Sequence, residues 1–91
     1  MSVIDRIAAE HRDAFVAVLA QEDPALLEAL RGKDVPSYQE WETVQEVLND
    51  EFSKYYGPDH EPDETGVKID NALGAFMTQF PGDELPDYPY R

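Results

Sequence analysis

Acidic side chains gather most densely between residues 59 and 70. Four of them occupy places one, three, five and twelve of an EF-hand-like loop: Asp59, Glu61, Asp63 and Asp70. Carboxylate oxygens are ligands that calcium prefers, but the sixth place of such a loop needs glycine for a sharp turn. That place holds Glu64, and Pro62 stiffens the middle. A weak calcium-binding module at 59–70 is therefore an alternative interpretation, and an acidic helix start is the simpler one.

Other residue types that bind metals or perform catalysis are scarce. The chain has no cysteine, and nothing in the spacing of its two histidines, His11 and His60, brings them together at one metal. No nucleophile-elbow, phosphate-binding or dinucleotide-binding motif is present. The sequence therefore predicts a non-enzymatic protein without a cofactor or a dedicated metal site.

A second acidic pattern lies on a helix. Glu42, Glu46 and Asp50 are spaced four residues apart, so they lie on one face, opposite the apolar stripe. Like charges at this spacing destabilise a helix by a few tenths of a kcal/mol each. A partner carrying Lys or Arg would relieve that cost and associate faster. A solvated outer face without a role is the alternative.

Tyrosines accompany the acids. Tyr56 lies about 100° from the apolar stripe, which predicts exposure beside the acidic segment, and tyrosine is favoured at interface hot spots. Tyr88 and Tyr90 either fold back with Leu85 over the helices or form a partner-binding arm. The predicted partner-binding residues are Glu42, Glu46, Asp50, Tyr56, Asp59, Glu61 and Asp63.

One short region resembles the colicin-type nuclease immunity proteins. It consists of Tyr55-Tyr56 with Pro58, an acidic loop and then Gly66-Val67, about a quarter of the chain. Gly57 is inserted here, and the tyrosines end a long helix rather than occupying a short one. Immunity proteins of this type are small acidic four-helix inhibitors whose tyrosine pair contacts a basic nuclease. The resemblance implies an inhibitor, without placing the chain in that family.

Four helices position these residues. Apolar spacing predicts a first helix from about Ser2 to Gln21. A short second helix starts at Asp23-Pro24 and ends at Gly32, for which we expect a left-handed cap. A Ser37-x-x-Glu40 capping box opens the third.

The third helix is the longest and ends at Gly57-Pro58. Asp63 or Thr65 caps the fourth, in which Gly74 indicates close approach of another helix, and Pro81 ends it. We therefore predict an all-α fold, a small four-helix bundle with three main helices and one short helix. Residues 1–80 form a single helical domain, and residues 81–91 form an extended Pro/Tyr-rich C-terminal arm.

Charge is the strongest global feature. Twenty Asp and Glu oppose seven Lys and Arg, giving a formal net charge of -13. Such a field repels nucleic acid and anionic membranes and attracts basic surfaces. High charge that only maintains solubility, or reflects an acidic host, is the alternative. Without a signal peptide or a membrane-spanning run, we expect a cytoplasmic protein.

The sequence thus favours a small acidic protein, a monomer or homodimer, that docks on a basic protein surface. Its function would be that of an inhibitor, an immunity or antitoxin-like protein, or a nucleic-acid mimic. The alternatives are a structural or adaptor domain without dedicated chemistry and the calcium module described above.

Overall fold

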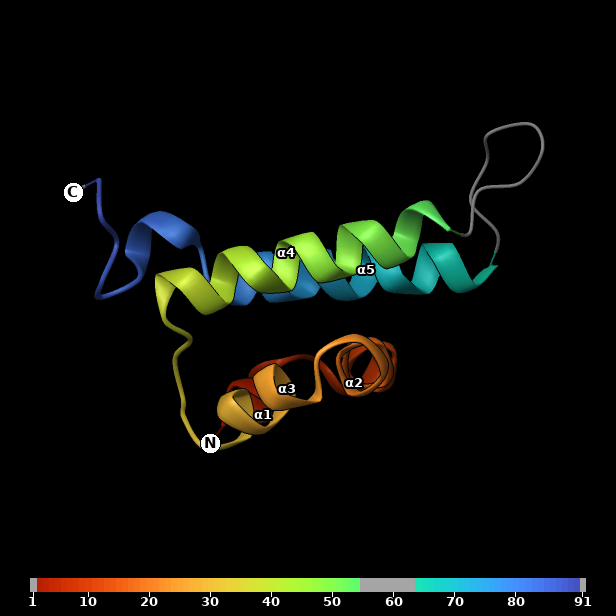
Figure 1. Cartoon of the computed structure of the whole chain (residues 1–91), viewed down its shortest axis with the longest axis horizontal. Helices are drawn as coiled ribbons and strands as arrows, with labels where there is room; N and C mark the ends of the chain where they lie inside the picture. Colours follow the sequence, from red (N-terminus) through yellow and green to blue (C-terminus); the bar gives the residue numbers. More distant parts are fainter. Residues whose placement is uncertain (1, 55–63, 91) are drawn as a thin grey trace.

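The computed structural model describes residues 2–54 and 64–90 (Figure 1). These residues form α1 (Val3–Arg6), α2 (Ala9–Glu22), α3 (Pro24–Arg31), α4 (Tyr38–Ser53), α5 (Glu64–Gln79) and the short 3-10 helix η1 (Gly82–Glu84). No strand occurs within the two described ranges, which confirms the predicted all-α class.

The helices pack in two layers. α4 and α5 lie side by side along the long axis of the molecule, and α1, α2 and α3 cover one side of the pair (Figure 1). α2 contacts α3, α4 and α5, and Figure 1 shows it nearly end-on, so it crosses α4 and α5 rather than running beside them. The arrangement thereby differs from the predicted bundle, in which neighbouring helices are nearly parallel or antiparallel.

One hydrophobic cluster joins the two layers. Phe15 of α2 stacks on Phe76 of α5 with ring centroids 5.4 Å apart, and both side chains are fully buried. Leu19, Leu30 and Leu48 bring α2, α3 and α4 to the same cluster. Full burial of such a side chain contributes about 1.5–3 kcal/mol, so this cluster is the main source of stability.

The predicted first helix is in fact two helices. The chain becomes extended at Ile7, with φ -78° and ψ 134°, and α2 begins two residues later. The Arg12 side chain donates hydrogen bonds to the carbonyl oxygens of Ile4, Asp5 and Ile7 at 3.0–3.1 Å. The bonds to Asp5 and Ile7 satisfy carbonyl groups at the break, while the Ile4 carbonyl also accepts the Ile7 amide at 3.2 Å. Ile7 is 1% exposed.

The predicted helix starts are confirmed where the structure describes them. Ser2 and Ser37 each form a reciprocal capping box, with Asp5 and Glu40 respectively. The Asp23 carboxylate accepts a hydrogen bond from the Leu26 amide at 3.1 Å.

Two expectations about glycine are wrong. Gly32 ends α3 with φ -95°, outside the left-handed region, because the last turn closes with a hydrogen bond from its amide to the Ala29 carbonyl. Gly74 was expected at a close helix contact, but a side chain built there would meet nothing within 4 Å. The predicted stop at Gly57-Pro58 lies outside the described residues.

The segment after α5 is not the extended arm that its proline content predicted. It forms η1, and Leu85 enters the core with 2% exposure. The Trp41 indole Nε1 donates to the Phe80 carbonyl at 2.8 Å, which secures the start of the segment to α4. Proline prevents a long helix here but does not prevent turns that bury Leu85, so the alternative in which this segment folds back is confirmed.

Candidate functional site

Three of the predicted partner-binding residues lie on one exposed face of α4. Glu42, Glu46 and Asp50 are all exposed, as the helical period requires. Within the described ranges, none of the three lies within 4 Å of a Lys, Arg or His nitrogen. We call these three residues the acidic ladder; their role in binding stays a prediction.

The two acids beside the ladder are engaged inside the fold. Glu51, which directly follows Asp50, is 4% exposed and pairs with Lys54 Nζ at 3.0 Å. The same ammonium lies 3.4 Å from Glu22 at the end of α2. The hydrogen bonds that Lys54 donates to these two carboxylates raise its pKa and hold it charged, and the bond to Glu51 contributes most. Lys54 thus joins α2 to α4.

Glu40, on the N-terminal side of the ladder, caps the start of α4. It accepts hydrogen bonds from the Ser37 amide and from Lys33 Nζ, each at 2.8 Å. Partial burial acts to raise the pKa of Glu40, but these hydrogen bonds and the Lys33 charge outweigh it, so the pKa lies below its usual value. Glu40 and Glu51 therefore stabilise the fold. Of the acids discussed on α4, only those of the acidic ladder remain available to a partner.

The chain around the ladder contains no basic residue. No Lys or Arg occurs between Lys33 and Lys54, or between Lys68 and Arg91. Apart from the pairs of Glu40 with Lys33 and of Glu51 with Lys54, the described residues of α4 and of the segment that packs at its start are consequently acidic. Arg6, Arg12, Arg31 and Lys33 belong to α1–α3 or directly follow α3. The charge of the protein is thus unevenly divided between its two layers.

A group of tyrosines at the start of α4 was missed by the sequence reasoning as a unit. The rings of Tyr38, Tyr88 and Tyr90 meet edge to face, with centroids 5.5–6.2 Å apart. Tyr38 also stacks on Trp41 at 5.5 Å. The only signal in the sequence was the pair Tyr88 and Tyr90, because their meeting with Tyr38 depends on how the chain folds back.

Asp87 and Glu42 bring negative charge to these rings. The Asp87 carboxylate accepts the Tyr38 backbone amide at 3.0 and 3.1 Å, so it caps α4 from a distant part of the chain. This is a favourable place for an anion, because the amide dipoles point their positive end there. Removal of the Tyr38 phenol from water raises its pKa, with further contributions from Glu42 and the two other tyrosines.

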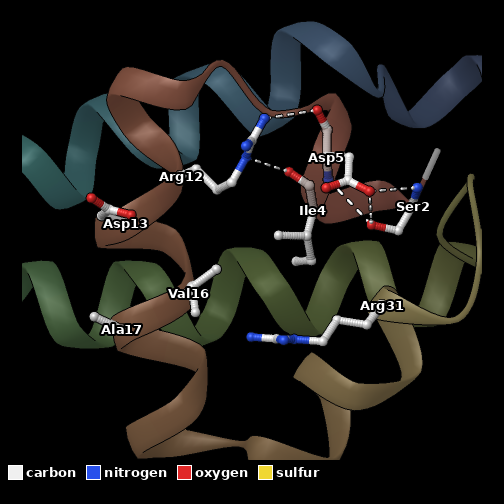
Figure 2. A pocket seen from close by; sticks show the side chains of 8 residues that line it. All are labelled: Ser2, Ile4, Asp5, Arg12, Asp13, Val16, Ala17 and Arg31. Carbon is white, nitrogen blue, oxygen red and sulfur yellow. Dashed lines mark hydrogen bonds between the residues drawn. The ribbon is translucent and has the colours of Figure 1, made fainter.

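A surface depression of about 670 Å³ lies between α1, α2 and α3, and Figure 2 shows the side chains that line it. Arg12 and Arg31 line it together with Asp5 and Asp13. The Arg12 guanidinium is directed at α1, where its hydrogen bonds hold the helix break. Arg31 lies 4.0 Å from Glu28 and is half-exposed. Arg12, the more buried of these two cations, therefore has a structural role.

The other predicted site residues, Tyr56, Asp59, Glu61 and Asp63, lie outside the described residues. Of the calcium-loop positions, Glu64 is the first residue of α5 and pairs with Lys68 at 3.6 Å, and Asp70 lies further along the same helix. A straight helix spreads its side chains rather than folding them around one ion. Within residues 2–54 and 64–90, no three metal-ligating side chains come together.

No helix in the described part of the chain has the length and apolar character needed to cross a bilayer. Comparison with protein-family models, curated proteins and solved structures gives no match. The resemblance to immunity proteins stays a prediction, since Tyr55 and Tyr56 also lie outside the described residues. Function must be argued from this chain's own residues.

Proposed function

We propose that this is a non-enzymatic binding protein that uses α4 to dock on a basic protein surface, as an inhibitor or nucleic-acid mimic does. The observation that carries the proposal is the acidic ladder: Glu42, Glu46 and Asp50 are exposed and lie in a stretch of chain without Lys or Arg. A fold whose own charges are used for stability pairs them, as Glu40 and Glu51 are paired here.

The electrostatic repulsion within the acidic ladder also supports a basic partner. Carboxylates one turn apart repel each other, and the repulsion costs a few tenths of a kcal/mol for each pair. A basic surface would offset this cost and would be attracted from a distance by a net charge of -13. Because the ladder lies on a helix held at both ends, by Glu40 and by Glu51, it presents its charges on a rigid element.

The test is a double charge reversal on the ladder. Glu46→Lys with Asp50→Lys should weaken binding to a basic protein captured at low salt by about tenfold or more. The same change should leave the unfolding free energy equal or slightly higher, since the lysine introduced at position 46 would form a favourable i,i+4 pair with Glu42. Affinity by calorimetry and stability by circular dichroism measure the two effects separately.

The matched control reverses two exposed acids in the other layer, Glu10→Lys with Glu28→Lys. Their side chains are 78% and 76% exposed, and the net charge changes by the same amount. Equal loss of affinity in both double variants would show that total charge, not the α4 surface, drives binding. An affinity that does not change with salt concentration would contradict the proposal altogether.

A further inference from the structure

The start of α4 carries a second surface that differs in chemistry from the ladder. Tyr38, Tyr88, Tyr90 and Glu42 form it, and we call it the tyrosine patch. Its three rings lie at interplanar angles of 69–80° to one another. The Tyr90 side chain is 76% exposed, although large aromatic side chains elsewhere in the described ranges are at least partly covered.

The position of these rings makes them receptive to a cation. Aromatic faces attract cations, and desolvation strengthens the attraction. Glu42 follows Tyr38 by one turn of α4, so the two side chains lie on the same face of the helix and the carboxylate is a neighbour of the rings. Within the described residues, Glu42 forms no ion pair with a Lys, Arg or His. An exposed ring beside such a carboxylate is complementary to a side chain that is both flat and positively charged.

We infer that the tyrosine patch receives an arginine side chain of the basic partner, with the guanidinium on the Tyr90 ring and hydrogen-bonded to Glu42. Arginine fits this chemistry better than lysine, because its planar group stacks on aromatic rings and donates two parallel hydrogen bonds to a carboxylate. The inference rests on the proposed function, since it assigns one contact within the same basic partner surface. The ladder supplies attraction for any cation, and the patch supplies the preference for arginine.

The experiment compares three peptides at low salt: hexa-arginine, hexa-lysine and the neutral hexa-citrulline. Wild-type protein should bind hexa-arginine about threefold or more tightly than hexa-lysine. The ring protons of Tyr90 should shift with hexa-arginine more than with hexa-lysine. Hexa-citrulline should bind at least tenfold more weakly than either cationic peptide, because it lacks the charge.

Tyr90→Ala and Glu42→Gln should each reduce the arginine preference to about one. Glu46→Gln is the matched control, because it removes the same charge one turn along α4 and should keep the preference. Equal affinity for the two cationic peptides, or a preference that survives both patch variants, overturns the arginine site while the proposed function stands. Failure of wild-type protein to bind either cationic peptide overturns the proposed function and the arginine site together.

Discussion

Gly82, in the segment that follows α5, lies directly against the Trp41 indole of α4. A Cβ atom at Gly82 would lie 2.5 Å from the indole Cη2 and 2.6 Å from Cζ2. The indole cannot withdraw without breaking its hydrogen bond to the Phe80 carbonyl. At this position the missing side chain is what permits the contact.

Gly82→Ala should therefore destabilise the protein by about 1–3 kcal/mol, the usual cost of overpacking. Gly74→Ala is the matched control: nothing lies within 4 Å of its added methyl group, and alanine is the better helix former by about 1 kcal/mol. Urea unfolding followed by circular dichroism should give changes of opposite sign. Equal effects of the two substitutions would show that Trp41 is free to move aside.

Individual residues also show what could be predicted from sequence. The caps at Ser2, Asp23 and Ser37 were predictable, because each acts on amides within three residues. The break at Ile7 was not, since no glycine or proline marks it. It depends on Arg12, and on the Val3 amide donating to the Lys33 carbonyl at 2.7 Å, a contact between distant parts of the chain.

Among the elements, α4 depends most on electrostatic support at its first turn. Ser37, Glu40 and Asp87 all accept backbone amides there, and Glu40 adds the pair with Lys33. Anions at this end of a helix are stabilising. The start of α4 should consequently be sensitive to acid, at a pH set by the lowered pKa of Glu40.

Glu40→Gln tests this sensitivity. A carboxyl group with a folded-state pKa below its unfolded value stabilises the protein above the unfolded pKa and loses that effect as pH falls through the folded pKa. The variant should be less stable by about 0.5–1 kcal/mol at pH 7, and the difference should shrink as pH falls below the usual glutamate range and disappear below the lowered folded-state pKa of Glu40. Thermal unfolding from pH 7 to pH 3 measures it. Glu46→Gln serves as control, and a constant difference for Glu40→Gln across this range would contradict the mechanism.

The same element shows why the candidate site was only half predictable. The spacing of Glu42, Glu46 and Asp50 defines an exposed face from helical period alone. The neighbourhood of Tyr38 with Tyr88 and Tyr90 depends on the segment after α5 folding back, which in turn depends on burial of Leu85 and on the Asp87 cap. Periodicity describes one helix at a time and contains no information about such contacts.

At the scale of the whole molecule, the net charge of -13 opposes compaction. Among the described residues, acids without an intervening Lys or Arg are concentrated in α4 and the segment that packs at its start. Salt shortens the range of the repulsion between them, from about 30 Å at 0.01 M to about 10 Å at 0.1 M. Stability and binding should thus respond to salt in opposite directions.

Raising sodium chloride from about 0.01 M to 0.1 M should raise the thermal midpoint by several degrees, which corresponds to about 1 kcal/mol for a domain of this size. The double variant Glu46→Lys with Asp50→Lys changes the formal charge from -13 to -9, because each substitution adds two charges. Its midpoint should respond less to salt. A midpoint that falls with salt would show that ion pairs such as Lys54–Glu51 outweigh the repulsion.

Trp41 is the only tryptophan among the 91 residues, and its indole nitrogen is bonded to the Phe80 carbonyl where the last segment begins. Intrinsic tryptophan fluorescence therefore reports on the contact between α4 and residues 80–90, without any added label. If residues 80–90 detach before the helices melt, the emission will redshift at a lower denaturant concentration than the loss of helical signal. Because Trp41 also stacks on Tyr38 of the tyrosine patch, its fluorescence is suited to following the binding of a ligand to that patch in real time.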